Sequence, residues 1–437
     1  MDSTVTPRPF SPTRLIAFVA TCLWTLPLCG ADRHVSLKGV DAQDGAAATP
    51  WRTIGHAVSQ LTPGDTLHIA AGNYEEKIEV KVSGTAAAPI VLKGEAGAVL
   101  TGKQVKGDHM IHIQNQSHVH IIGIEIRDLL GTKDGSGIRI EGAGAGIQIL
   151  NCRIHEIRGK DAMGITVYGT SPEEAISGLV IQGNEVFDCD PATSEAIVLN
   201  GNVDGFNVAQ NIVHDVNNIG IDFIGGEDWV NKDRSKVARN GVCSGNTVYR
   251  CRSTYGGGYA AGIYVDGGQN IVIENNTVTQ CDLGIEIGAE NRGTVTSGII
   301  VRKNTLYLND KAGLVFGGYE NGAGRVKKCR FEGNIVYRND QHRKDQNGEL
   351  WIQFAEDNVI TGNVFWGGKE SPIVNVDKGA GTNVLSGNQH YSDAGAADAY
   401  YNWRETDVDG FQAWQAASGQ DRDSTFSQPQ LKLPANP

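Results

Sequence analysis

The stretch "GIYVDGGQNIVIENNTVTQCDLGIEIGAENRG", residues 262–293, carries the pattern that decides the predicted fold. Apolar and polar residues alternate in 263–266 and again in 285–287, which is typical of strands with one buried face. Between them lies "IVIENNTVTQC", in which Asn276 separates two more short strands. The stretch therefore predicts several short strands, one after another, joined by tight turns.

The same succession of strand, turn, asparagine and strand recurs along most of the chain. Its asparagines lie 25 to 35 residues apart, and Cys152 holds the equivalent position upstream. They are Asn184, Asn211, Asn246, Asn276, Asn304, Asn334, Asn363 and Asn388. A unit of this length cannot bury its own apolar face, whereas stacked units share one core. The repeat predicts an all-β fold, a right-handed parallel β-helix of about ten coils, in which each asparagine bonds the backbone of the next coil.

Both ends of such a coil need a cover, because they expose unpaired strand edges and apolar interior. Residues 49–62 predict an N-terminal capping helix, with Thr49 as its N-cap and Pro50 in its first position. Residues 389–437 predict a C-terminal capping tail in which Phe411 and Trp414 cover the last coil. The β-helix domain is expected to span 32–437.

The first residues predict a secretory signal. Arg8 and Arg14 precede the apolar run "LIAFVATCLWTLPL", and small residues follow it, so residues 1–31 are expected to be a signal peptide. Its removal changes the net charge from −12 to −13, because two arginines and Asp2 are lost. This charge disfavours nucleic acid and anionic membranes as partners. The sequence thus predicts a secreted or periplasmic protein that does not insert into a membrane after cleavage.

Six cysteines remain after residue 31, and no pair among them has the spacing of a zinc site. Three of them, Cys189, Cys251 and Cys281, lie five residues after ladder asparagines and form a second stack. We expect free thiols in the core. A disulfide between Cys251 and Cys281 on neighbouring coils is the alternative in an oxidising compartment.

A family resemblance covers roughly residues 34–425. The capping helix followed by "PGDTLHIAAGNYEEKIEV" and "SGTAAAPIVLKGE", the asparagine-marked coils, and "FQAWQAASGQD" resemble secreted right-handed β-helix proteins of the pectate-lyase-like superfamily. The resemblance implies the fold. It also implies a function among polysaccharide lyases, glycoside hydrolases, epimerases, esterases and adhesins, without choosing one.

Aligning the coils on their asparagines also aligns the strand that follows each one, and its outward residues form two columns. The first column is Arg139, Thr166, Val198, Asp222, Tyr264, Glu286 and Val315, and the second is Glu141, Tyr168, Asn200, Ile224, Asp266, Gly288 and Gly317. Three carboxylates and a tyrosine thus gather on three consecutive coils, with Gly288 and Gly317 leaving space. The insertions 226–239 and 252–261 are expected to form the two walls of a groove there.

The clustered carboxylates predict a glycoside hydrolase. Crowding moves acid pKa values apart, so one carboxyl group holds a proton while another is ionised. Asp266, Glu286 and Asp222 are the candidate catalytic residues. The Asp in "GI-x-x-D" with a Glu on the next coil is similar to some β-helix xylosidase-like hydrolases, but "AENRG" after the Glu departs from them, so Glu290 can replace Glu286. The predicted substrate-binding residues are Tyr264, Tyr168, Asn200, Trp229, Glu290, Arg292 and Arg139, and Tyr255 and Tyr259 are further candidate faces for sugar rings.

Two alternatives remain open at this stage. A polysaccharide lyase would use Ca²⁺ to neutralise a uronate, held by Asp222, Asp266 and Glu286 with Glu227 or Asp228, whereas the hydrolase needs no cofactor. The base of the lyase would come from a loop or the adjoining strand, where the candidates are Lys232, Arg234, Tyr264, Arg292 and His214. A non-catalytic glycan-binding or adhesin β-helix is the second alternative, although its surface should repeat along many coils.

Overall fold

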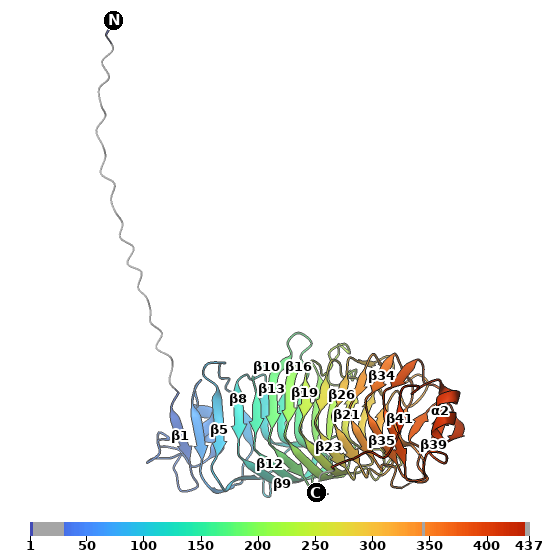
Figure 1. The fold of residues 1–437 in the computed structure, drawn as a ribbon. Helices are drawn as coiled ribbons and strands as arrows, with labels where there is room; N and C mark the ends of the chain where they lie inside the picture. The colour runs from blue at the N-terminus through green and yellow to red at the C-terminus, as the bar shows by residue number, and fades with distance from the viewer. Residues whose placement is uncertain (3–29, 343–345, 433–437) are drawn as a thin grey trace.

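The chain folds into one elongated right-handed parallel β-helix (Figure 1). The computed structural model describes residues 1–2, 30–342 and 346–432, so most of the predicted signal peptide lies outside the described residues. The solenoid makes about twelve turns, somewhat more than predicted. The early coils, which include Asp32–Val35 (β1) and Thr66–Ile69 (β2), lack the repeating asparagine. A number of coils counted from the asparagines therefore leaves them out.

Three parallel sheets run along the solenoid, and each coil contributes one strand to each. The first sheet contains β1, β2, β5 (Ile90–Gly94), β8 (Val119–Ile122), β11 (Gln148–Leu150), β13 (Ile176–Gln182), β16 (Val203–Ala209), β19 (Val242–Ser244), β22 (Val272–Glu274), β26 (Ile300–Arg302), β30 (Arg330–Glu332), β34 (Asn358–Thr361) and β37 (Asn383–Ser386), with β10 (Gly144–Ala145) beside β13. The second contains β3 (Gly72–Tyr74), β6 (Ala98–Thr101), β9 (Glu125–Glu141), β12 (Arg153–Gly169), β14 (Glu185–Phe187), β17 (Ile212–Val216), β20 (Thr247–Cys251), β23 (Thr277–Thr279), β27 (Thr305–Tyr307), β31 (Ile335–Tyr337), β35 (Val364–Gly367), β38 (Gln389–Ser392) and β41 (Thr425–Phe426).

The third sheet carries the candidate site. It contains β4 (Ile78–Val80), β7 (His109–Gln114), the second halves of β9 and β12, β15 (Ile197–Gly201), β18 (Ile221–Ile224), β21 (Ala261–Asp266), β24 (Leu283–Gly288), β28 (Ala312–Phe316), β32 (Gly348–Ile352), β36 (Val374–Val376) and β39 (Tyr400–Trp403). The long strands β9 and β12 turn the corner and join the second sheet to the third. A small sheet of β25 (Val295–Ser297), β29 (Arg325–Lys327) and β33 (Ala355–Glu356) lies next to β24. The strand β40 (Thr406–Asp409) pairs antiparallel with β39.

The core consists of apolar side chains stacked in register. In the third sheet Ile221 pairs with Ile263, Ile263 with Ile285, and Ile285 with Leu314, and all four are fully buried. Inward residues of the other two sheets continue the same core. Because one face of every strand is buried in this way, a register slip of one residue would turn the apolar residues outward.

The asparagines form the predicted ladder. Each side-chain Nδ2 donates to the Oδ1 of the next ladder asparagine at 2.9–3.1 Å. The same Oδ1 accepts the backbone N–H of the preceding asparagine at 2.9–3.0 Å. The ladder begins at Cys152, whose N–H donates to Asn184, and ends at Asn388, which donates to the Asp421 carboxylate. All eight asparagines are buried, so the ladder satisfies polar groups that water cannot reach.

A second ladder links the corner between the second and third sheets. Cys281 N–H donates to Asn309, Asn309 donates to Asn339, and Asn339 donates to the buried Glu349 carboxylate. The six cysteines of the described residues are free and buried, so the alternative disulfide between Cys251 and Cys281 is absent. No helix within the described part of the chain is long and apolar enough to cross a membrane.

Helices cover both ends of the coil, with different bounds from those expected. The first, α1, spans Ile54–Gln60, shorter than the predicted 49–62, and its N-cap is Thr53 rather than Thr49. Thr49 instead closes a turn with Ala46, and Glu76 accepts from the free N–H groups of Ile54 and Gly55. At the other end α2 (Phe411–Ser418) buries Phe411 and Trp414, while β38 still belongs to the coil although its residues fall within the expected capping tail.

The ladder predicts the effect of Asn276→Ala. The substitution removes the acceptor of Asn246 N–H and the side-chain donor to Cys243 C=O. Asn246 Nδ2 and Asn304 Oδ1 each lose one hydrogen bond and keep another, all in the buried interior. We expect the free energy of unfolding to fall by about 2–4 kcal/mol. Asn73→Ala, at an exposed position of β3, is the matched control and should change it by less than about 0.5 kcal/mol. Urea unfolding followed by circular dichroism measures both, and equal losses would contradict the role of the ladder.

Candidate functional site

The two outward columns of the third sheet form as predicted. The strand register pairs Val198 with Asp222, Asp222 with Tyr264, and Tyr264 with Glu286 in the first column. In the second column Tyr168 pairs with Asn200, and Asp266 pairs with Gly288. The parallel stacking therefore brings Asp222, Asp266 and Glu286 into one neighbourhood from distant parts of the sequence.

The N-terminal half of this surface is covered, contrary to the expectation of one long groove. The insertion 226–239, which we call the cover loop, lies over the sheet and contributes no groove wall. Val230 packs with Tyr168, Val198 and Ile224 in an apolar cluster that also includes Met163. Asn231 donates to the carbonyl groups of Gly169 and Ser171 at 2.9 and 3.0 Å.

Four of the predicted substrate-binding residues are therefore structural in this fold or lie outside the groove. Tyr168 is buried between Arg139, whose guanidinium lies 4.2 Å from the ring centroid, and Trp229, whose ring lies edge-on at 5.4 Å. Arg139 itself binds Asp134 and Glu141. Asn200 is buried and donates to Glu227 at 2.6 Å. Trp229 is exposed, but it contacts the covered surface and not the groove.

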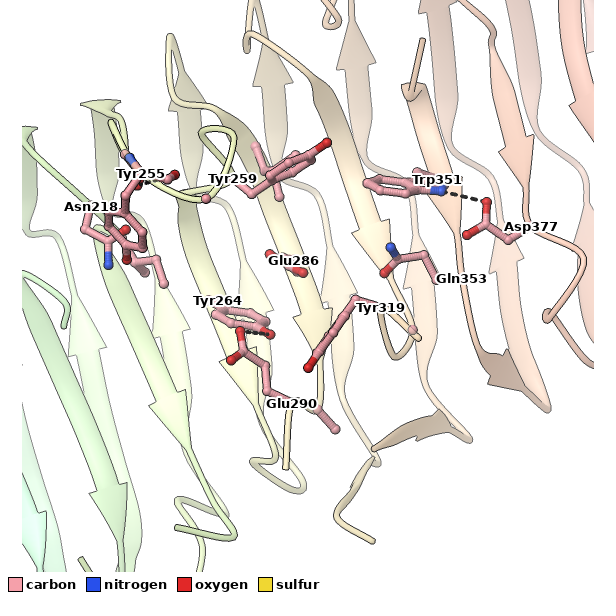
Figure 2. Close-up of a pocket in the computed structure, with 16 residues that line it drawn as sticks. Asn218, Tyr255, Tyr259, Tyr264, Glu286, Glu290, Tyr319, Trp351, Gln353 and Asp377 are labelled. Atoms are coloured by element: carbon pink, nitrogen blue, oxygen red, sulfur yellow. Dashed lines mark hydrogen bonds between the residues drawn. The ribbon is translucent and has the colours of Figure 1, made fainter. Parts of the chain in front are cut away.

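An open groove of about 460 Å³ begins where the cover loop ends. Glu286 lies on its floor, and Tyr264 and Glu290 line it from the same side (Figure 2). Its other lining residues are Asn218, Ile219, Ser253, Tyr255, Gly256, Tyr259, Leu283, Ala289, Gly317, Tyr319, Trp351, Gln353 and Asp377. The insertion 252–261 thus forms one wall, as predicted. Gly288 leaves no free space, because a Cβ there would lie 2.7 Å from Tyr264 Oη.

Aromatic rings surround Glu286 in this groove. Tyr255 and Tyr259 come from the wall loop, and Tyr319 comes from the turn after β28; all three are exposed at the surface. Trp351 lies in the first column two coils beyond Glu286, where its Nε1 donates to Asp377 at 2.9 Å (Figure 2). Exposed rings around a polar floor are suited to stacking against the apolar faces of sugars.

Glu286 and Glu290 differ in their surroundings. Burial raises the pKa of Glu286 well above its usual range, and the negative charges of Glu290 and Asp266 raise it further. Glu290 is exposed at the edge of the groove, where its Oε1 accepts a hydrogen bond from Tyr264 Oη at 3.3 Å. The groove therefore contains one carboxyl group that favours its protonated form beside another that reaches solvent.

Asp222 and Asp266 lie beside the groove and do not line it. Burial raises the pKa of both carboxyl groups, helped by Glu195 and Asp266 for Asp222, and by Glu290 for Asp266. Asp222 accepts the N–H of Phe223, and Asp266 accepts the N–H of Glu290, each at 2.6 Å. Asp266 therefore fixes the turn that carries Glu290, which places it as a positioning residue.

The remaining candidates are scattered. Arg292 lies on the turn that carries Glu290, where its carbonyl accepts from Arg234, but it does not line the groove. His214 stacks between Phe187 and Tyr249 on the second sheet, and Lys232 is exposed on the cover loop. Within the described ranges, no group of three or more His, Cys, Asp or Glu residues is arranged to hold a metal ion. The donor set expected for Ca²⁺ therefore does not fit one.

Several lining residues were not predicted from the sequence. Trp351 follows Val315 in the first column, but its strand "GELWIQF" lacks the glycine–aliphatic start of the other copies. Asp377 and Gln353 follow the ends of β36 and β32. Glu195 was also not predicted, although it does not line the groove. It lies shortly before β15, where its charge raises the pKa of Asp222. A search that followed the first column beyond Val315 would have found Trp351.

The comparisons with known proteins agree with this architecture. The family described as Pel9A-like, right handed beta helix region matches residues 33–235, and the model of the right handed beta helix region matches residues 243–413. The YwoF protein of Bacillus subtilis is 34% identical over 418 residues, which cover 91% of this chain and 88% of that protein. The chain belongs to the right-handed β-helix family that includes YwoF.

Solved structures with this fold include enzymes of two reaction types. The GH136 lacto-N-biosidase from Eubacterium ramulus superposes with a TM-score of 0.63 at 16% identity, covering 83% of this chain and 68% of that one. An alginate lyase from Paenibacillus sp. superposes with a TM-score of 0.50 at 17% identity, covering 69% and 95%. At these identities the likeness shows the right-handed β-helix fold alone and does not identify the reaction.

The buried acids predict how stability varies with pH. A carboxyl group whose folded-state pKa is raised stabilises the fold below its ordinary pKa of about 3.9, and this stability is lost as the pH rises toward the raised value. Asp222→Asn keeps the acceptor for Phe223 N–H and removes the charge. We expect its melting temperature to match that of the wild type near pH 4 and to exceed it by a few degrees at pH 7.

The matched control is Asp398→Asn, at an exposed carboxylate near the C-terminal cap. Its melting temperature should stay close to that of the wild type at both pH 4 and pH 7. Differential scanning calorimetry from pH 4 to pH 8 measures the comparison. An Asp222→Asn variant that is less stable than the wild type at pH 7 would show that the buried charge is compensated in the fold.

Proposed function

We propose that the protein is a secreted or periplasmic glycoside hydrolase that cleaves a neutral glycan in the groove around Glu286. One observation carries the proposal. The sixteen residues that line the groove include Glu286 and Glu290 and several exposed aromatic rings, but no lysine, arginine or histidine. Paired carboxyl groups with different surroundings supply the acid and the base or nucleophile that glycoside hydrolysis needs.

In this mechanism Glu286 is the general acid. Its raised pKa, caused by burial and by the charges of Glu290 and Asp266, keeps the proton on the carboxyl group near neutral pH. It donates this proton to the bridging oxygen as the bond to the anomeric carbon breaks. Glu290 is its partner at the edge of the groove, which attacks the anomeric carbon or activates a water molecule. Tyr264 donates to Glu290, and Asp266 holds the Glu290 backbone, so both position that carboxylate.

The groove disfavours the two alternatives. A uronate glycan would bring its own carboxylates against Glu286, Glu290 and Asp377, with no lining cation to neutralise them. Burial raises the pKa of the Tyr264 hydroxyl well above its usual range, so the hydroxyl keeps its proton and does not act as the base of a β-elimination. A purely binding solenoid is expected to repeat its surface along many coils, whereas the open acidic and aromatic surface here is confined to a few.

Charge-removing substitutions test the catalytic pair. Glu286→Gln and Glu290→Gln should each lower kcat at least about a hundredfold, because each removes a proton donor or acceptor from the reacting bond. Glu320→Gln, which changes an exposed carboxylate next to Tyr319, is the matched control and should keep nearly full activity. Reducing ends released from a panel of neutral and uronate glycans are measured alongside the ultraviolet absorbance of unsaturated products.

The outcomes separate the reactions. Reducing ends without absorbance support the hydrolase, whereas reducing ends with absorbance on a uronate glycan would establish the lyase instead. Full activity in both Gln variants would remove Glu286 and Glu290 from the mechanism. The absence of any product from every glycan that binds would establish a binding protein.

A further inference from the structure

The first column changes from covered to open at one defined coil. Its side chains from Arg139 through Asp222 to Tyr264 are no more than 4% exposed. Glu286, on the next coil, is partly exposed, Val315 after it is buried, and Trp351 and Asn375 farther on are again partly exposed. The groove starts on the coil before Tyr264, where Asn218 and Ile219 line it, and extends toward the C-terminal coils.

The cover loop closes the other direction. Val230 packs so closely on Gly201 that a Cβ there would lie 2.9 Å from Val230 Cγ1. Asn231 fixes the loop to two carbonyl groups of the segment that ends β12, those of Gly169 and Ser171. These contacts leave no path for a glycan chain over the sheet beyond Tyr264.

The closed end is braced against the turn that carries Glu290. Arg234 Nε donates to the Gly226 carbonyl at 2.7 Å, and its Nη2 donates to the Arg292 carbonyl at 3.0 Å. Gly226 also lies close to Thr294, because a Cβ at Gly226 would meet Thr294 Oγ1 at 2.3 Å. The cover loop is thus joined by a hydrogen bond and by close packing to the turn that carries Glu290, although it lines no part of the groove.

The open end continues along the sheet. Figure 2 shows the groove running from Asn218 and Tyr255 past Glu286 to Trp351 and Asp377. Asn375 and Asn402 extend the first column farther in the same direction and are partly exposed. A long substrate can therefore lie along these coils, but it can enter the groove only by one of its ends.

We infer that the enzyme acts on glycan chain ends and releases one or two sugar units at a time, an inference that rests on the proposed hydrolase function. The groove extends two coil steps from Glu286, about 9.6 Å, to the coil of Asn218, which leaves space for no more than about two sugar rings. The released unit occupies the closed end beside Tyr264, Tyr255 and Asn218, and the remaining chain lies over Trp351.

The reaction at this end balances as an ordinary hydrolysis. The bond between the anomeric carbon of the terminal sugar and the bridging oxygen breaks, and Glu286 gives its proton to that oxygen. Water supplies the hydroxyl group that ends on the anomeric carbon, and its remaining proton restores the carboxyl pair. No other reactant is consumed.

The first test follows product length with the full wild-type chain. Linear neutral oligosaccharides of xylose, mannose, glucose and galactose are incubated with the enzyme, and mass spectrometry follows the products from the earliest times. We expect a monosaccharide or a disaccharide and the correspondingly shortened chain to appear together. An early mixture of internal fragments would overturn the inference while leaving the hydrolase intact.

The second test measures binding and does not depend on turnover. Calorimetry with Glu286→Gln compares each oligosaccharide with the same molecule carrying bulky aryl groups at both ends. We expect blocking to weaken binding at least tenfold. Equal affinities would overturn the inference, and weaker binding of blocked chains without any cleavage by the wild type would overturn the hydrolase alone. If none of these sugars binds or is cleaved, both proposals fail.

The third test opens the closed end. Replacing residues 228–236 with two glycines removes the part of the cover loop that lies on the sheet. The variant should release longer fragments than the wild type from the same oligosaccharide, since chains can then extend past Tyr264. An unchanged product length from a folded variant would overturn the inference. If this variant does not fold, the product lengths of the first test and the affinities of the second test decide whether the enzyme acts on chain ends.

Discussion

The fold depends on the buried ladder of asparagines that links each coil to the next. Each ladder oxygen accepts two hydrogen bonds from the previous coil, so an asparagine in the wrong register would leave several buried polar groups unpaired. This penalty, together with the stacked aliphatic core, fixes the register of all three sheets. The register in turn decides which outward side chains become neighbours, and so a constraint inside the solenoid determines the chemistry on its surface.

That constraint forces like charges together on the third sheet. Asp222 and Asp266 are buried beside Glu195 without a basic partner, and their raised pKa values record the unfavourable burial of charge. A solenoid that served only as a scaffold would gain stability by replacing them with apolar residues. Their presence next to Glu286 and Glu290 fits a site in which crowded acids keep one carboxyl group protonated near neutral pH.

The regular parts of the molecule could be predicted from the sequence, and the irregular parts could not. Period-two alternation and spaced asparagines give the coil, the two columns and the pairing of Asp222, Tyr264 and Glu286, because strand geometry repeats from coil to coil. The path of the cover loop depends on contacts such as Val230 on Gly201, which follow no period. Sequence reasoning therefore placed Tyr168 and Asn200 in a groove from which this loop excludes them.

A crystal structure of Glu286→Gln with a bound neutral oligosaccharide tests the central claim most directly, because it locates the sugar relative to both carboxyl positions. The account predicts a terminal ring beside Tyr264, its anomeric carbon facing Glu290, its bridging oxygen at position 286, and the following rings over Trp351. Sugar density that avoids residues 286 and 290, or that lies on another sheet, would contradict it.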